Sequence, residues 1–108
     1  MQQNQLGWSA KEKALAQDVF KRAYGREIRV LLKEVREQAT TLAEAEDIWR
    51  LHDFLSARRH DIDGKYDDRE SSLIFAFATL LKDGLLSLDE LEGLAADKLA
   101  KVSALSRM

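Results

Sequence analysis

Apolar residues recur along the chain at the 3.6-residue period of an amphipathic helix, and capping signals divide this pattern into four segments. The first helix is predicted to start at Ser9, because Glu12 three positions later completes an S-x-x-E capping box. It is predicted to end near Gln38. Its core-facing stripe is made of Leu15, Val19, Ala23, Ile28, Leu31 and Val35.

A second helix is predicted to open at Thr41, with Glu44 as its box partner, and to end near Asp63 and Gly64. Glycine suits a left-handed helix cap at that end. A turn of about 100° per residue places two stripes side by side on this helix. One is an ordinary apolar stripe, made of Ile48, Leu51, Leu55 and Ile62. The other is aromatic and charged, and a core does not require its side chains: Trp49, His52, Asp53, Ser56, Arg59, His60 and Asp63.

A third helix is predicted from Asp67, with Glu70 as its box partner, to Asp83 and Gly84. Its residues 73–78 are apolar on every side, a pattern that a buried strand would also show. A fourth helix is predicted to open at Ser87, with core positions at Leu88, Leu91, Leu94, Lys98, Val102 and Leu105. The chain has no proline, and the expected fold class is all-α.

The first predicted helix is too long for one compact chain to cover. About 28 residues would span ~42 Å, whereas a compact domain of about 100 residues has a radius of gyration near ~13 Å. Val30 and Leu32 also lie outside the main apolar stripe of the first helix, and Ile48 on the second helix is left over with them as a further apolar residue to cover. These observations predict a homodimer through the two long helices, and sedimentation of a 12 kDa species alone at micromolar concentration would contradict it.

Composition and charge exclude several classes of function. The 108 residues suffice for one domain, and the absence of cysteine excludes disulfides and thiolate metal sites. The first residues do not resemble a secretory signal and no apolar run reaches the ~20 residues that span a bilayer, so we expect a cytoplasmic protein without an integral membrane segment. The net charge is −2, and the acidic groups interspersed among the basic ones disfavour binding of nucleic acid.

A calcium site is the first specific chemistry to consider. A twelve-residue window from Arg59 to Glu70 resembles an EF-hand loop, with matches at Asp61, Asp63, Gly64, Asp67 and Glu70. Arg59, however, stands at the first ligand position, where its fixed charge would repel a cation. Helix capping explains Gly64, Asp67 and Glu70 equally well. We therefore predict no metal site and no cofactor.

Catalysis has little support in the sequence, whereas protein binding has more. His52 and His60 leave no third ligand for zinc, and the chain has no Gly-rich phosphate loop or nucleophile elbow. Exposed tryptophan and arginine, in contrast, are enriched at the hot spots of protein interfaces. Trp49 and Arg59 therefore favour a non-enzymatic protein-binding module. Trp49 fits a core or dimer-interface position equally well.

The segment from Trp49 to Arg69, WRLHDFLSARRHDIDGKYDDR, resembles the signature region of the fluorescence recovery protein family of cyanobacteria. Further matches are Trp8-Ser9, FKRAY at 20–24, IFAFATLL at 74–81 and LAADKLAKVSAL at 94–105. The resemblance implies one all-helical domain over residues 1–108, with a dimerising stem at about 9–63 and a head at about 64–108.

The resemblance also implies a function. Proteins of this family bind the photoactivated red form of the orange carotenoid protein, chiefly at its C-terminal domain. They accelerate its return to the inactive orange form, which ends photoprotective quenching of the phycobilisome. The expected location is the cytoplasm, with the cytoplasmic side of the thylakoid membrane as a peripheral site. The implied partner-binding residues are Trp49, His52, Asp53 and Arg59, with Phe75 and Lys101 as contacts from the head.

Two other functions stay open at this point. One is a helical dimeric adaptor that binds another partner without changing its rate of relaxation. The other is a calcium-responsive helix-loop-helix domain. Measuring the red-to-orange decay separates the regulator from the adaptor, and calorimetry with calcium tests the third.

Overall fold

The computed structural model describes residues 7–108, so most of the segment inspected for a secretory signal lies outside the described residues. Its elements are α1 (Ala10–Ala39), α2 (Ala45–Lys65), the 3-10 segment η2 (Glu70–Ser72), α3 (Leu73–Lys82), the 3-10 segment η3 (Leu88–Leu91) and α4 (Ala96–Ser106). The described chain contains no strand, which confirms the all-α fold class. None of its helices is both long enough and apolar enough to cross a membrane.

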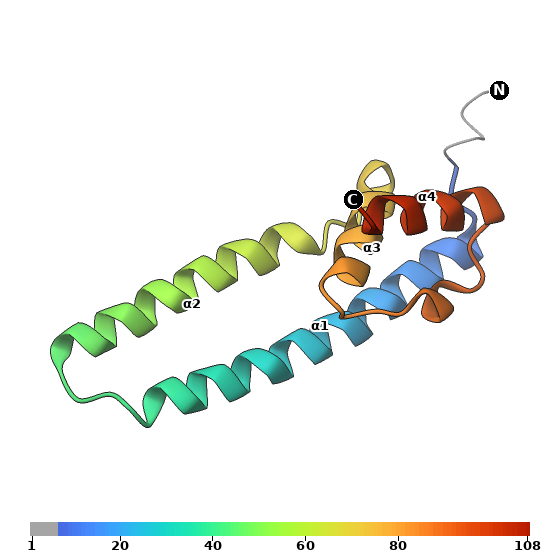
Figure 1. Cartoon of the computed structure of the whole chain (residues 1–108). Helices are drawn as coiled ribbons and strands as arrows, with labels where there is room; N and C mark the ends of the chain where they lie inside the picture. The colour runs from blue at the N-terminus through green and yellow to red at the C-terminus, as the bar shows by residue number, and fades with distance from the viewer. Residues whose placement is uncertain (1–6) are drawn as a thin grey trace.

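The molecule has a compact end and a long extension (Figure 1). We call head the part built by α3, α4 and the N-terminal half of α1, and stem the rest of α1 together with α2, which runs antiparallel to it. The extents are 61 × 26 × 23 Å and the radius of gyration is 17.1 Å. This radius exceeds the ~13 Å of a compact domain of similar length, so the elongation expected from the first helix is confirmed.

The hydrophobic core lies in the head. Phe77 of α3 is its centre, and Trp8 and Phe20 pack edge-on against it at ring distances of 6.1 and 5.5 Å. The periodic positions predicted to face inward contribute the rest, including Val19, Ala23, Leu91, Leu94 and Val102. The run at 73–78 forms a helix rather than a strand.

The capping box that opens α1 forms as predicted. The Ser9 side chain accepts from the Glu12 N–H at 3.1 Å, and Glu12 Oε1 accepts from the Ser9 N–H at 3.0 Å. Glu12 also reaches across the head, where its Oε2 accepts from the Ala95 N–H at 2.9 Å and its Oε1 from Lys98 Nζ at 2.9 Å. Burial raises the pKa of Glu12, but these bonds outweigh burial and hold the pKa at about 2.

We expect the free energy of unfolding to fall as the pH drops from about 4.5 to about 2. The pKa of Glu12 is lower in the folded chain than in the unfolded one, so its contribution is complete above the unfolded value and is lost on protonation. This contribution is roughly 3 kcal/mol. Urea unfolding across this pH range measures it, and Glu12→Gln should lose roughly 3 kcal/mol less than the native chain. Equal losses in the two proteins would contradict the expectation.

The predicted start of the second helix is wrong, and so is the left-handed cap predicted at Gly64, although the helix ends within about one residue of the predicted position. Its N-cap is Glu44 rather than Thr41, whose hydroxyl donates to the Gln38 carbonyl at 2.9 Å and so belongs to the end of α1. Asp47 closes the cap instead, because its carboxylate accepts from the Glu44 N–H at 3.0 Å. At the other end α2 continues through Gly64, which is not left-handed, and stops at Lys65.

The start predicted for the third helix is also wrong. The Asp67 carboxylate accepts from the Arg69 N–H and guanidinium, so it closes a local turn and does not cap α3. Only the short η2 follows, and α3 begins at Leu73. Its end is as predicted, because Gly84 takes the left-handed φ of 76° and the Leu85 N–H donates to the Leu80 carbonyl at 2.9 Å.

The fourth helix starts later than predicted. The box between Ser87 and Glu90 forms, but it opens only η3, and α4 begins at Ala96. Gly93 interrupts the helical pattern with φ 119°, a value that other residues rarely adopt. A Cβ on Gly93 would lie 3.4 Å from Leu15 Cδ2, an ordinary contact distance, so the backbone conformation rather than lack of space requires glycine here.

Candidate protein-binding site

One face of α2 carries side chains that the fold of this chain does not bury. We call α2 stripe the seven residues identified by helical periodicity; all are exposed: Trp49, His52, Asp53, Ser56, Arg59, His60 and Asp63. Within α2 only Ile62 is buried. A core position for Trp49 is therefore wrong within one chain, since 60% of the residue is exposed. A dimer interface stays open as a role for it.

The first part of the α2 stripe is a small cluster within one turn of helix. The Trp49 and His52 rings lie edge to face, with centroids 6.4 Å apart. His52 Nδ1 lies 3.3 Å from Asp53 Oδ1. The aspartate therefore contacts the imidazole that lies against the indole. This arrangement gives an apolar plate bordered by polar groups, a composition typical of interface hot spots.

Arg59 lies further along the same stripe, about 15 Å from Trp49 by the rise of the helix. Its Nε is 3.6 Å from Asp63 Oδ2, and its side chain is 85% exposed. Asp53 is paired with His52 instead, and Arg59 is paired with Asp63, so the two site residues are not paired with each other. A surface pair of this kind contributes little stability, which leaves the guanidinium available to an incoming carboxylate.

The α2 stripe ends at a groove between α2 and α3. We call it the α3 groove; its volume is about 480 Å³, and its lining includes His60, Lys65, Phe75, Ala76 and Thr79. Phe75 is 62% exposed on its rim, although it lies in an otherwise apolar helix. His60 belongs to both the stripe and the groove. The structure thus joins the α2 residues and Phe75 into one continuous surface.

Lys101 stands apart from this surface. It is exposed on α4 and forms no hydrogen bond or ion pair with any residue in the range 7–108. Sequence reasoning, conversely, did not place His60 and Thr79 at the site. His60 could have been included because it falls on the stripe, whereas Thr79 becomes visible only once α3 is packed against α2.

The EF-hand-like window does not form a calcium-binding loop. Asp61, Asp63 and Gly64 lie within α2, which continues to Lys65. Asp67 is engaged by Arg69, and Glu70 pairs with Lys13 at 2.9 Å. Within the described range no group of three or more histidine, aspartate or glutamate side chains could hold a metal ion.

Comparisons of the sequence and of the structure with known proteins lead to the same family. Residues 8–106 match the family described as photoprotection regulator fluorescence recovery protein. The fluorescence recovery protein of Synechocystis sp. (strain ATCC 27184 / PCC 6803 / Kazusa) is 51% identical over 108 residues, which are 100% of this chain and 99% of that protein.

Solved structures agree with the sequence match. The structure of the Fremyella diplosiphon fluorescence recovery protein is 58% identical and has a TM-score of 0.89, covering 94% of this chain and 100% of that one. The structure from Synechocystis sp PCC 6803 is 53% identical, with a TM-score of 0.89 and the same coverage. The family match contains all four helices and hence both the α2 stripe and the α3 groove. The chain therefore belongs to the fluorescence recovery proteins, a family of photoprotection regulators.

Proposed function

We propose that this chain binds the photoactivated red form of the orange carotenoid protein at its C-terminal domain and accelerates its return to the inactive orange form. Quenching of the phycobilisome then ends. Membership of the photoprotection-regulator family supports the proposal. The observation that carries it is the surface itself, on which two large aromatic side chains, Trp49 and Phe75, are 60% and 62% exposed on neighbouring elements.

The proposed action requires no covalent chemistry. An accelerator of relaxation has to bind the transition state for domain closure more tightly than the open form, and each ~1.4 kcal/mol of that difference gives a tenfold faster return. Differential affinity for two conformers is sufficient. We propose that Trp49 and Arg59 hold the exposed C-terminal domain, that His52 and Asp53 orient it, and that Phe75 and Lys101 add contacts from the head. No cofactor and no nucleic acid take part.

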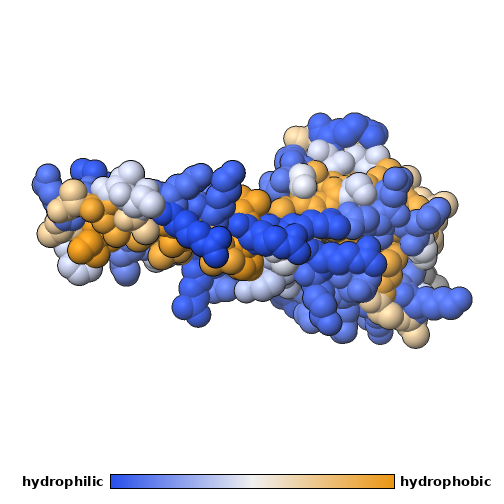
Figure 2. Space-filling model, turned by 90° about the horizontal axis from the view of Figure 1, so that it is seen from below, coloured by the Kyte–Doolittle hydropathy of each residue, from blue (hydrophilic) through white to orange (hydrophobic). Residues whose placement is uncertain are grey.

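We further propose that the active species is a homodimer formed through the stem. Apolar residues of α1 and α2 that the described part of the chain leaves partly exposed support it: Val30, Leu32, Ile48 and Leu55 are exposed by 53, 47, 53 and 36%. Figure 2 shows hydrophobic side chains at the surface of the stem, between hydrophilic ones. We also propose that the dimerising residues fall within about 9–63, and that about 64–108 complete the head together with the N-terminal half of α1. Sedimentation at micromolar concentration tests the dimer. The proposed location is the cytoplasm, including the cytoplasmic side of the thylakoid membrane.

Arg59→Leu should reduce the acceleration of the red-to-orange decay at least about tenfold at subsaturating concentration, because it removes a planar cation from the proposed contact. The measurement is the absorbance decay after illumination, with and without the chain. Arg50→Leu is the matched control, since nine residues of helix place Arg50 on the opposite side of α2. Its side chain is also largely exposed, at 73%. The control should accelerate the decay as the native chain does.

The oligomeric state of each variant has to be known before its activity is compared. Equal sedimentation of Arg59→Leu and the native chain would assign a loss of activity to partner contact. A decay that the native chain leaves unchanged at saturation rejects the regulator and favours the adaptor. An Arg59→Leu chain that is fully active as a dimer rejects the role of Arg59.

A further inference from the structure

Glu27 is a buried carboxylate at the point where α1 passes from the head to the stem, and the proposed function assigns it no role. It is 4% exposed. Ala23, one turn before it, lies in the head core, whereas Val30, about one turn after it, is 53% exposed. A buried carboxylate is costly unless several donors surround it.

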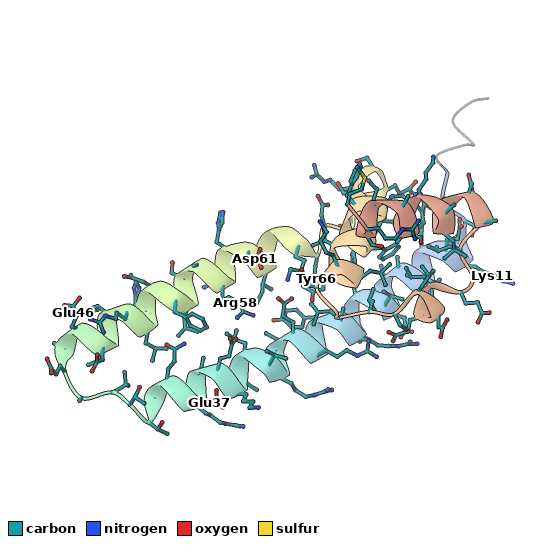
Figure 3. The ribbon with its side chains drawn as sticks, in the orientation of Figure 1. Lys11, Glu37, Glu46, Arg58, Asp61 and Tyr66 are labelled. Atoms are coloured by element: carbon teal, nitrogen blue, oxygen red, sulfur yellow. The ribbon has the colours of Figure 1, made fainter. Side chains whose placement is uncertain are left out.

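The donors come from the last turns of α2 and the residue that follows. Lys65 Nζ donates to Glu27 Oε2 at 2.7 Å, and the Tyr66 hydroxyl donates to Oε1 at 2.8 Å. Arg58 Nη2 lies 3.8 Å from Oε2. Figure 3 shows Arg58 and Tyr66 between the ribbons of α1 and α2. One carboxylate thus accepts two hydrogen bonds and has a second cation nearby, all from α2 and the residue that follows it.

Lys65 also connects the polar cluster around Glu27 to α3. Its Nζ is 2.9 Å from an oxygen of Asp83, the C-cap of α3, and its side chain is only 6% exposed. Burial lowers the pKa of Lys65, but the hydrogen bonds to Glu27 and Asp83 outweigh burial and hold that pKa above its usual value. Tyr66 also packs edge-on against Phe20 of the head core, at a ring distance of 5.6 Å.

Little else within this chain sets the direction of α2. Side-chain packing normally fixes the angle between two helices, but Ile62 is the only buried apolar residue of α2. The other bond between the two long helices is the pair of Arg58 Nη1 with Glu34 Oε1 at 2.6 Å, further along the stem. The direction in which α2 leaves the head therefore depends on the polar cluster around Glu27.

We propose that Glu27 is a positioning residue that aligns the α2 stripe with the α3 groove, so that one partner surface can contact both at once. The inference rests on the proposed function in taking the stripe and the groove as contacts for the same partner. Alignment before binding favours affinity because the two surfaces need not be ordered when the partner arrives.

The chain has no cysteine, so introduced cysteines can be labelled specifically and the direction of α2 relative to the head can be measured as a distance. Ala57→Cys on α2 and Ala100→Cys on α4 are exposed sites for a pair of nitroxide labels, and Ala57 lies opposite the apolar stripe of α2. Labelled chain diluted into an excess of unlabelled chain restricts pulsed EPR to distances within one chain. We expect one narrow distribution for the native background. Glu27→Ala should broaden or shift it, whereas the matched control Glu37→Ala, an exposed glutamate on the same helix, should leave it unchanged.

Binding to the photoactivated orange carotenoid protein supplies a second measurement, which a merely structural role would not affect. Phe75→Ala should weaken binding about tenfold in the native background but less than about twofold in Glu27→Ala, because the groove and the stripe no longer engage together. A loss of affinity in the single variant Glu27→Ala could follow from lower stability. Lower stability would not, however, remove the effect of Phe75→Ala, which reports on coupling between the α2 stripe and the α3 groove.

An unchanged distance distribution in Glu27→Ala would overturn the proposal, and so would an equal effect of Phe75→Ala in both backgrounds. If Glu27→Ala does not fold, Glu27→Gln takes its place with the same expectations, since the amide still accepts from Tyr66 but offers no charge to Lys65. The distances are measured without a partner. A native chain that fails to accelerate relaxation would thus reject the proposed function and leave the positional result standing.

Discussion

Phe77→Ala should lower the free energy of unfolding by about 3–5 kcal/mol, whereas Phe75→Ala should change it by less than about 0.5 kcal/mol. Phe77 is fully buried, and its ring contacts those of Trp8 and Phe20, so truncation leaves a cavity at the centre of the head core. Phe75 lies two residues earlier on the same helix but is 62% exposed. The same substitution therefore compares the inward and outward faces of α3.

Chemical denaturation followed by circular dichroism measures both changes. All proteins have to be compared at one concentration, because association of folded chains adds a concentration-dependent term to the apparent stability. Similar losses in the two variants would show that Phe75 is covered in solution, by a second copy or by a rearranged head. Phe75→Ala should instead show its main effect on binding of the carotenoid protein, where Phe77→Ala acts only through stability.

Most faces of the helices were predictable because helical periodicity is a local property, although Leu88, a predicted core position, is 42% exposed. Val19, Leu91 and Val102 were assigned to the core from spacing alone, and each is fully buried. The same geometry placed the α2 stripe on the outside. Neither assignment needs knowledge of what packs against the helix, because the polar and apolar residues already separate by angle.

The ends of the helices were less predictable because the S/T/D-x-x-E pattern does not act alone. The pattern at Ser9 opens a long helix, but the one at Ser87 opens only a 3-10 segment. The helix does not continue there because Gly93, two residues after this segment, has a φ of 119°, which is not helical. Thr41 and Asp67 use their oxygens in other local bonds, and so do not cap the helices predicted to follow them. A cap depends on the competing partners nearby, and these are set by tertiary packing.

Contacts between residues that are distant in the sequence were not predictable either, as the candidate site shows. The stripe on α2 could be predicted, whereas the groove could not, because its walls come from two helices whose packing no sequence spacing encodes. The same holds for the buried pair of Glu12 and Lys98, which are 86 residues apart. Lys98 was placed on a core stripe by its spacing, and only the structure supplies the partner that makes burial of its charge possible.

Lys98→Met should lower the free energy of unfolding by about 3–5 kcal/mol, because it leaves the Glu12 carboxylate buried without its counter-ion. Lys98 is 8% exposed, and its Nζ donates to Glu12 Oε1 at 2.9 Å and to the Gly7 carbonyl at 2.7 Å. It also lies 4.7 Å from the centre of the Trp8 ring. Lys101→Met, one turn later on the exposed side of α4, should change stability by less than about 0.5 kcal/mol.

The double variant Glu12→Gln/Lys98→Met decides whether the loss comes from an unpaired charge or from packing. The glutamine has one acceptor oxygen, so it keeps the bond from the N–H of Ser9 or of Ala95 but not both, and Glu12→Gln alone measures the cost of the lost bond. If the unpaired carboxylate is the cause, the double variant should be more stable than Lys98→Met by about 1–3 kcal/mol. If packing against Trp8 is the cause, the effects of the two single changes should add. Urea unfolding of the four proteins at neutral pH distinguishes the two, because there Glu12 is fully ionised and the charge term is at its largest.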